Sequence, residues 1–244
     1  MVNQKVTYST ILESISKEKK GLAVLIDPDK TKPEGLSSFM HKLNNSIATH
    51  IFIGGSTVEA DATENLVLEI KKQTQLPIVL FPGDVSQITN HANAILYLSL
   101  LSGRNPEYLI GQHIASVSKL KNTNLEVIPT GYLLIESGKE TAVQRVTQTQ
   151  PMPINNIQAI VDTAKAGELL GMKLMYLEAG SGAIHAVSSS IIQAVKEELK
   201  IPVLVGGGIR SKQQIDAAYQ AGADVVVIGT AFEEDASFFN ELKK

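Results

Sequence analysis

The chain has 244 residues, of which 43% are hydrophobic and 19% charged, with a formal net charge of -3 and no cysteine. The absence of cysteine excludes disulfides, thiolate chemistry and cysteine-ligated metals, and the charge offers no basic surface for nucleic acid. The length fits one barrel-sized domain over residues 1–244. Because the sequence shows no signal peptide and no apolar run long enough to span a bilayer, we expect a cytoplasmic protein.

Eight short apolar runs rich in valine and isoleucine recur along the chain, with longer amphipathic stretches between them. Most are continuously apolar, which is typical of strands buried on both faces of a parallel sheet. The predicted strands are residues 22–26, 50–53, 77–81, 94–98, 125–129, 174–178, 202–206 and 224–229. Helical patterns occupy residues 58–72, 106–119, 157–170, 188–199 and 212–221. Eight βα units in this length predict an α/β fold, a single-domain (βα)8 TIM barrel, although an open doubly wound sheet fits the same strands.

Two connections depart from this regular pattern. Residues 82–93, between the third and fourth strands, are too few for an ordinary crossover helix with its loops. We therefore expect the third helix of the barrel to be reduced or missing. Residues 130–153, after the fifth strand, are predicted to form a long insertion with β-like segments of its own. Both connections belong on or beside the face where a barrel carries its function.

The last two predicted strands both end in glycine. Residues 206–208 are three glycines after the seventh strand, and Gly229 and Thr230 follow the eighth. Glycines let a ligand approach the backbone N–H groups, and the helix that follows adds its positive dipole end. Loops after strands 7 and 8 are the usual phosphate site of TIM barrels. The tandem arrangement favours a phosphate or phosphate-ester site; the alternative is that the glycines only make tight turns.

The first two strands end in oxygen-bearing side chains. Asp27 lies at the tip of the first strand, where a carboxylate can share Mg²⁺ with phosphate oxygens of a substrate. Asp29, two residues on, is expected to cap the next helix. After the second strand, Ser56 or Thr57 is expected to cap a helix, which does not exclude contact with a metal or a diphosphate. The five histidines show no metal-ligand spacing and are expected at the surface.

A lone carboxylate, Glu178, ends the sixth strand just before the turn containing Gly180 and Gly182. It precedes the tandem glycine loops by one βα unit and belongs to the same rim as Asp27. A carboxylate here either acts as a general base beside a bound phosphate ester or is only a polar residue where a strand stops.

Taken together, these segments resemble the geranylgeranylglyceryl phosphate synthase family, a group of prenyltransferases with a modified TIM barrel. The matching stretches are VLIDPDK, IFIGGST, LSLLSGRNPEYLIG, PTGYLLIESG, TQPMP, YLEAGSGA, VGGGIRS and IGTAFE, which cover most of the chain in order. The family also has a missing or altered third helix. The resemblance implies transfer of a long isoprenyl chain, geranylgeranyl first among them, from its diphosphate to the 3-hydroxyl of sn-glycerol 1-phosphate, with release of pyrophosphate and formation of an ether-lipid precursor.

The resemblance also assigns residues. Asp27 and Ser56 match the Mg²⁺ positions, and Glu178 matches the catalytic glutamate. The positions for glycerol 1-phosphate fall on Tyr176, Leu177, Glu178, Ala179, Gly180, Ser181, Gly182, Gly207, Gly208, Gly229 and Thr230. Lys30 and Arg104 are the candidate cations for the diphosphate, because charges near Asp27 can neutralise it as it leaves. Some relatives carry a lysine where this chain has Leu25, which leaves open the cation that meets the diphosphate besides Mg²⁺ and Lys30.

Further expectations concern assembly, the product and rival functions. The family implies a homodimer or homohexamer, and the product is expected to partition to membranes. Two rival functions fit part of the pattern: another phosphate-binding TIM-barrel enzyme, such as a sugar-phosphate isomerase, and a non-catalytic protein that binds a phosphate ligand.

Overall fold

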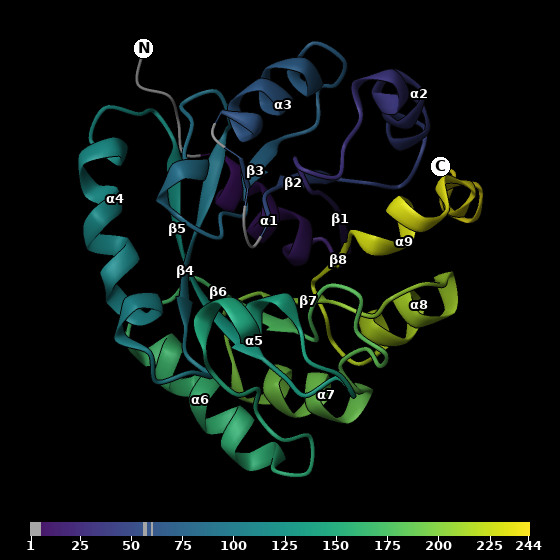
Figure 1. The fold of residues 1–244 in the computed structure, drawn as a ribbon. Helices are drawn as coiled ribbons and strands as arrows, with labels where there is room; N and C mark the ends of the chain where they lie inside the picture. Colours follow the sequence, from purple (N-terminus) through teal and green to yellow (C-terminus); the bar gives the residue numbers. More distant parts are fainter. Residues whose placement is uncertain (1–5, 56–57, 60) are drawn as a thin grey trace.

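A computed structural model describes residues 6–55, 58–59 and 61–244, and its centre is a closed barrel of eight parallel strands (Figure 1). The strands follow in chain order, and the last pairs with the first, Gly21 opposite Val225. This closure confirms the TIM barrel and rules out the open sheet. The strands are β1 (Gly21–Ile26), β2 (His50–Ile53), β3 (Ile78–Leu80), β4 (Ala94–Leu100), β5 (Glu126–Leu134), β6 (Leu174–Glu178), β7 (Val203–Gly206) and β8 (Val225–Ile228).

The helices are α1 (Thr7–Ser16), α2 (Pro33–Asn44), α3 (Ala62–Lys71), α4 (Gln112–Leu120), α5 (Ala142–Thr147), α6 (Ile157–Leu169), α7 (Ser189–Glu198), α8 (Lys212–Gln220) and α9 (Thr230–Glu234). Figure 1 shows α2, α3, α4, α6, α7 and α8 around the barrel, with α1 across its middle in this view. Ser188 and Ser211 cap α7 and α8 by accepting from backbone N–H groups of the first turn. Among the described residues, no helix has the length and apolar character to cross a membrane.

The connection between β3 and β4 contains one short 3₁₀ turn, η1 (Val85–Gln87), where an ordinary barrel has a helix. This confirms the expected loss of the third crossover helix. The π-helical turn η2 (Glu107–Gly111) leads into α4, and the 3₁₀ segment η3 (Ala236–Leu242) follows α9.

The predicted insertion after the fifth strand begins later than expected. Residues 130–134 belong to β5 itself, because they pair with β6 from Thr130 opposite Leu174 to Leu134 opposite Glu178. The strand therefore continues past Pro129, and the insertion proper contains α5.

Two hydrophobic layers hold the barrel together. One fills its interior and includes Ala23, Phe52, Val79, Ala94, Leu96, Ile128, Leu174, Leu204 and Val225. The other packs the outer faces of the strands against the helices. Ile11 of α1 joins the interior layer, and the buried Glu126 at the start of β5 accepts from the N–H groups of Thr7 (2.7 Å) and Tyr8 (3.2 Å). The first helix therefore covers the N-terminal end of the barrel.

Candidate active site

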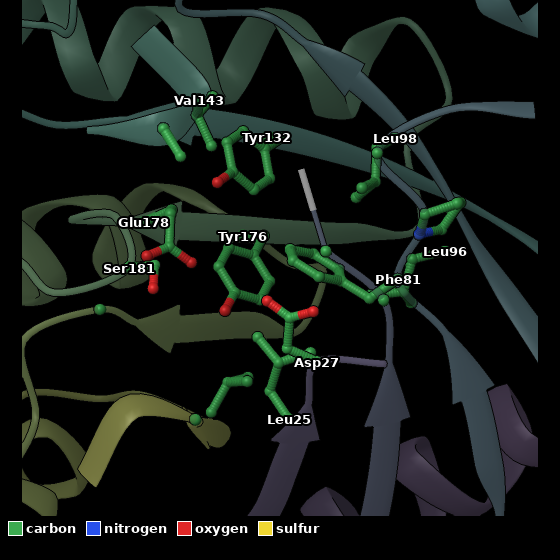
Figure 2. A pocket seen from close by; sticks show the side chains of 18 of the residues that line it. Leu25, Asp27, Phe81, Leu96, Leu98, Tyr132, Val143, Tyr176, Glu178 and Ser181 are labelled. Atoms are coloured by element: carbon green, nitrogen blue, oxygen red, sulfur yellow. The ribbon is translucent and has the colours of Figure 1, made fainter. Parts of the chain in front are cut away.

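A pocket of about 370 Å³ lies at the carboxyl ends of the strands. Residues at or near the end of every strand line it, from Leu25 and Asp27 of the first to Val227 and Thr230 of the last. Its volume and its position match the usual ligand site of a TIM barrel. In Figure 2 the carboxylates of Glu178 and Asp27 lie on either side of Tyr176, and Leu96 and Leu98 lie beyond Phe81.

Glu178 is a buried carboxylate in this pocket, with 5% of its surface exposed. Its Oε1 accepts from the Gly180 N–H at 2.5 Å, and the neighbouring Tyr176 hydroxyl also favours its charged form. Burial raises the pKa of Glu178 from 4.5 to about 7, although these two donors act in the opposite direction. The carboxylate is thus held in one orientation with a pKa suited to proton transfer near neutral pH.

The loop after β7 packs its backbone directly on Glu178 and Tyr176. A Cβ at Gly206 would lie 2.2 Å from the Tyr176 hydroxyl, and one at Gly207 would lie 2.4 Å from Glu178 Oε1. Gly207 also has a φ of +80°, which other residues rarely adopt. The glycines of this loop are therefore required by close approach to the carboxylate, as well as by the turn.

The loops after β6 and β8 meet at the rim. The hydroxyls of Ser181 and Thr230 lie 3.3 Å apart, and both line the pocket with Gly208 and Gly229. Arg210 also lines the pocket; its Nη1 donates to the Ala183 carbonyl at 2.9 Å, and its Nε lies 3.5 Å from Glu234 Oε2.

The predicted glycerol-phosphate residues do not all face the pocket. Leu177 and Ala179 are buried and belong to the outer hydrophobic layer. Gly180 and Gly182 have positive φ angles that turn the chain, so that Ser181 reaches the pocket between them. Arg210 was not predicted from the sequence, although its position two residues after the three glycines places it beside the predicted phosphate site.

Asp27 and Lys30 form a second polar wall at the end of β1, next to the loop after β8. Asp27 Oδ1 accepts from the Asp29 N–H at 3.1 Å, and Oδ2 lies 3.2 Å from Lys30 Nζ. Lys30 Nζ also lies 3.1 Å from Glu233 Oε2. Lys30 is therefore beside Asp27, as predicted.

This wall has the oxygen donors that Mg²⁺ prefers, because Mg²⁺ commonly takes one or two carboxylates and completes its shell with phosphate oxygens and water. Asp27 supplies one such carboxylate at the pocket surface. No cluster of three histidine, cysteine, aspartate or glutamate residues exists in the described part of the chain. The second predicted metal position, Ser56, and its neighbour Thr57 lie outside the described residues.

Three other expectations are corrected by the structure. Arg104 does not line the pocket, because carbonyl groups at the end of β4 hold its guanidinium: Nη1 donates to Leu101 (3.1 Å) and Gly103 (2.7 Å). Asp29 does not cap α2; it lies ahead of the helix and accepts instead from the Glu59 N–H at 3.1 Å.

The surface expectation is wrong for two histidines. His50 is buried at the start of β2, where burial lowers its pKa to about 4. His113 is buried because α4 packs it against Tyr97 and Ser99 of β4.

The remainder of the pocket is apolar and aromatic. The rings of Tyr132 and Tyr176 stack with centroids 5.4 Å apart, and Phe81 stacks on Tyr176 at 5.3 Å. Beyond them the wall consists of side chains from η1 and the residue after it, β4, η2 and α5: Val85, Ile88, Leu96, Leu98, Tyr108 and Val143.

The apolar end of the pocket reaches α4 and closes on a pair of rings. Tyr97 and His113 pack edge to face at 4.4 Å, and the Tyr97 hydroxyl donates to the His113 carbonyl at 2.8 Å. Both residues also line a second cavity of about 400 Å³ between α4 and the end of α6. The ring pair therefore separates the two spaces.

The fold and the pocket define a class: (βα)8 barrel proteins with a ligand site at the carboxyl ends of the strands. Within this class the chain belongs to the PcrB family, whose model matches residues 13–244.

Related proteins agree with this membership. The chain is 54% identical over 233 residues to the geranylgeranylglyceryl phosphate synthase of Flavobacterium johnsoniae, covering 96% of each chain. It is 41% identical over 229 residues to the enzyme of the same name from Pyrococcus furiosus, covering 93% of this chain and 90% of the other. Its structure is similar to that of (S)-3-O-geranylgeranylglyceryl phosphate synthase from Thermoplasma acidophilum in complex with sn-glycerol-1-phosphate. That match has a TM-score of 0.90 and 32% identity, and covers 96% of this chain and 94% of that one.

Proposed function

We propose that this protein transfers a long isoprenyl group, geranylgeranyl first among the candidates, from its diphosphate to the 3-hydroxyl of sn-glycerol 1-phosphate. The relatives carry the name of this activity, and the Thermoplasma structure contains the proposed acceptor. The observation that carries the proposal is the position of Glu178, a buried carboxylate with a pKa of about 7 in a pocket that is polar at one end and apolar at the other.

The acceptor phosphate binds to the loops after β6, β7 and β8. Ser181 and Thr230 offer hydroxyls, the glycines at 207, 208 and 229 expose the backbone, and Arg210 brings a positive charge to the same rim. Backbone N–H groups in such loops form an anion site without long side chains. Glycerol phosphate held there places its 3-hydroxyl within the polar end, toward Glu178.

Glu178 acts as the general base. The new bond forms between the acceptor oxygen and carbon 1 of the isoprenyl group, while the bond from carbon 1 to the diphosphate oxygen breaks. The hydroxyl proton passes to Glu178, and the bonding electrons leave with pyrophosphate. Tyr132 and Tyr176 stay neutral hydroxyls throughout, because burial raises both pKa values well above their ordinary range. The Tyr176 hydroxyl, next to the Glu178 carboxylate, therefore does not compete for the proton.

The diphosphate binds at the neighbouring wall, at the end of β1. Asp27 would hold Mg²⁺ together with diphosphate oxygens, and Lys30 lies close enough to add its own charge. Mg²⁺ supplies charge neutralisation for the departing pyrophosphate. The Lys30 contact with Glu233 keeps the ammonium near Asp27 before substrate arrives.

The isoprenyl tail occupies the apolar end. From Phe81 the wall continues through Leu96 and Leu98 to Tyr108, which gives a trough of hydrocarbon contacts. Without a full helix between β3 and β4, Val85 and Ile88 of the short connection complete this wall. From the family resemblance we also propose a homodimer or homohexamer in the cytoplasm, with a product that partitions to membranes.

The test is a transfer assay with purified protein, Mg²⁺, radiolabelled sn-glycerol 1-phosphate and geranylgeranyl diphosphate. We expect label in the organic phase, and far less with sn-glycerol 3-phosphate, whose hydroxyls are presented with the opposite hand. Failure to form product with farnesyl, geranylgeranyl and longer diphosphates alike would contradict the proposal.

A further inference from the structure

Gln87 is a buried residue behind the wall of the pocket, with 2% of its surface exposed. It is the last residue of η1, the short turn that stands where the third crossover helix would be. Its carboxamide makes two hydrogen bonds to one residue of another loop: Nε2 donates to the Gly55 carbonyl at 2.8 Å, and Oε1 accepts from the Gly55 N–H at 3.2 Å. The side chain thus pairs with the backbone at the end of β2 as a neighbouring strand would.

The backbone that Gln87 holds lies against the diphosphate wall. A Cβ at Gly55 would lie 2.9 Å from Asp27 Oδ1, so the backbone at Gly55 is enclosed between the Gln87 carboxamide and the Asp27 carboxylate. One residue earlier, a Cβ at Gly54 would lie 1.9 Å from the Phe81 carbonyl oxygen. Both glycines line the pocket, whereas Gln87 does not.

Gln87 also connects this polar wall to the apolar one. Its near neighbours in sequence, Val85 and Ile88, line the tail end of the pocket. A single buried side chain therefore fixes the position of the short connection after β3 relative to the backbone of Gly55.

We propose that Gln87 is a positioning residue for the diphosphate end of the substrate. By clamping Gly55 it holds this stretch of backbone in contact with Asp27, so that the carboxylate keeps the geometry that an Mg²⁺-bound diphosphate requires. It acts through Gly55 and touches no substrate. Loss of a partner behind a metal or anion site typically weakens binding about 10- to 100-fold.

This proposal rests on the proposed function, because that function supplies the diphosphate. A buried amide that serves stability alone would affect both substrates equally, since it would loosen the whole barrel. A positioning role instead affects the diphosphate wall and leaves the glycerol-phosphate loops after β6, β7 and β8 unchanged, because the Gln87 carboxamide bonds to Gly55 and not to those loops.

The experiment compares Gln87→Met, which removes both hydrogen bonds at similar volume, with Gln87→Glu, which keeps the acceptor for the Gly55 N–H and loses the donor. Gln158→Met, at an exposed position of α6, is the matched control. Calorimetric titrations with Mg²⁺ and inorganic pyrophosphate, and separately with sn-glycerol 1-phosphate, measure each end without turnover. If Gln87→Met does not fold, Gln87→Glu provides the same comparison.

We expect pyrophosphate binding to weaken about tenfold or more in both Gln87 variants, with glycerol phosphate binding within about twofold of wild type. Equal weakening for both ligands, or wild-type pyrophosphate binding, would overturn the positioning role. Wild-type protein that binds pyrophosphate but forms no prenyl product would contradict the proposed reaction and leave the role of Gln87 intact. Normal prenyl transfer together with unaltered pyrophosphate binding in the variants would contradict the role of Gln87 and leave the proposed reaction intact.

Discussion

The two ends of the pocket are built differently. At the polar end, Glu178 and the glycines after β7 are in direct contact, and a single Cβ at Gly207 would collide with the carboxylate. At the apolar end, ordinary hydrophobic side chains such as Leu96 and Leu98 share the wall with residues of η1, η2, α4 and α5. At the polar end, backbone therefore packs closely around one functional group. At the apolar end, many side chains each contribute a small part of the wall.

This difference leads to a contrast in sensitivity. Changes at the polar end should act on the chemical step or on one ligand, and should be large. Changes at the apolar end should alter which tail fits, by small factors, because the hydrophobic contribution is spread over many contacts.

The largest effect is expected for Glu178→Gln. The variant keeps the size of the side chain and removes the base, so turnover should fall about 10²- to 10⁴-fold. The affinity for sn-glycerol 1-phosphate should change little. Single-turnover rates and equilibrium binding measure the two quantities, with Glu197→Gln, an exposed position on α7, as the control. An equal loss of rate and affinity would mean that Glu178 shapes the pocket and does not take the proton.

A smaller loss is expected for Gly207→Ala. The new methyl group would meet Glu178 Oε1 at a residue with a φ of +80°, so we expect kcat/KM to fall about 10- to 100-fold and the protein to lose about 1–3 kcal/mol of stability. Gly35→Ala is the matched control, because a Cβ at this helical position meets nothing within 4 Å. Steady-state kinetics and thermal unfolding would check both. Wild-type kinetics in Gly207→Ala would show that the carboxylate tolerates displacement.

The polar end was largely predictable from sequence because its signals are local. Asp27 and Glu178 each end an apolar run, and glycines follow two more such runs, so parallel strands bring them all to one rim. The barrel itself followed from the same runs. The missing third helix followed from chain length alone, since residues 82–93 cannot form a full crossover.

The features that the sequence did not predict depend on contacts between residues that are far apart in the chain. Arg104 and Arg210 both follow strands, and a backbone carbonyl accepts from each guanidinium, but only Arg210 lines the pocket. Nothing in the sequence distinguishes Gln87 from other glutamines, because its role depends on its hydrogen bonds to Gly55. The surface expectation for His113 failed because packing of α4 on β4 buries one side of the helix.

The pH dependence of stability gives a further test of the polar end. Glu178 has an ordinary pKa of 4.5 that burial raises to about 7 in the folded protein. Between these values the folded chain holds a proton that the unfolded chain has released, so the free energy of unfolding contributed by Glu178 falls as pH rises, and stays low above pH 7. Glu178→Gln has no such titration. It should therefore gain stability over wild type across that window, by on the order of 1–3 kcal/mol at pH 8. Urea unfolding at pH 5 and pH 8 measures the difference, and a constant difference at both values would contradict the burial argument.

The smallest effect is expected at the apolar end, for Tyr97→Ala. Tyr97 and His113 separate the pocket from the second cavity, so removing one ring should join the two spaces and let a longer tail continue past α4. We expect kcat/KM for longer prenyl diphosphates, relative to kcat/KM for geranylgeranyl diphosphate, to rise a few-fold. The rise should be small because an added isoprenoid unit in an open cavity makes only some of the apolar contacts that a closed pocket would give. Tyr97→Phe keeps the ring and should behave as wild type. A ladder of prenyl diphosphates measures the ratio. A uniform loss at every tail length would mean that Tyr97 supports the packing of α4 on β4 and does not limit the tail.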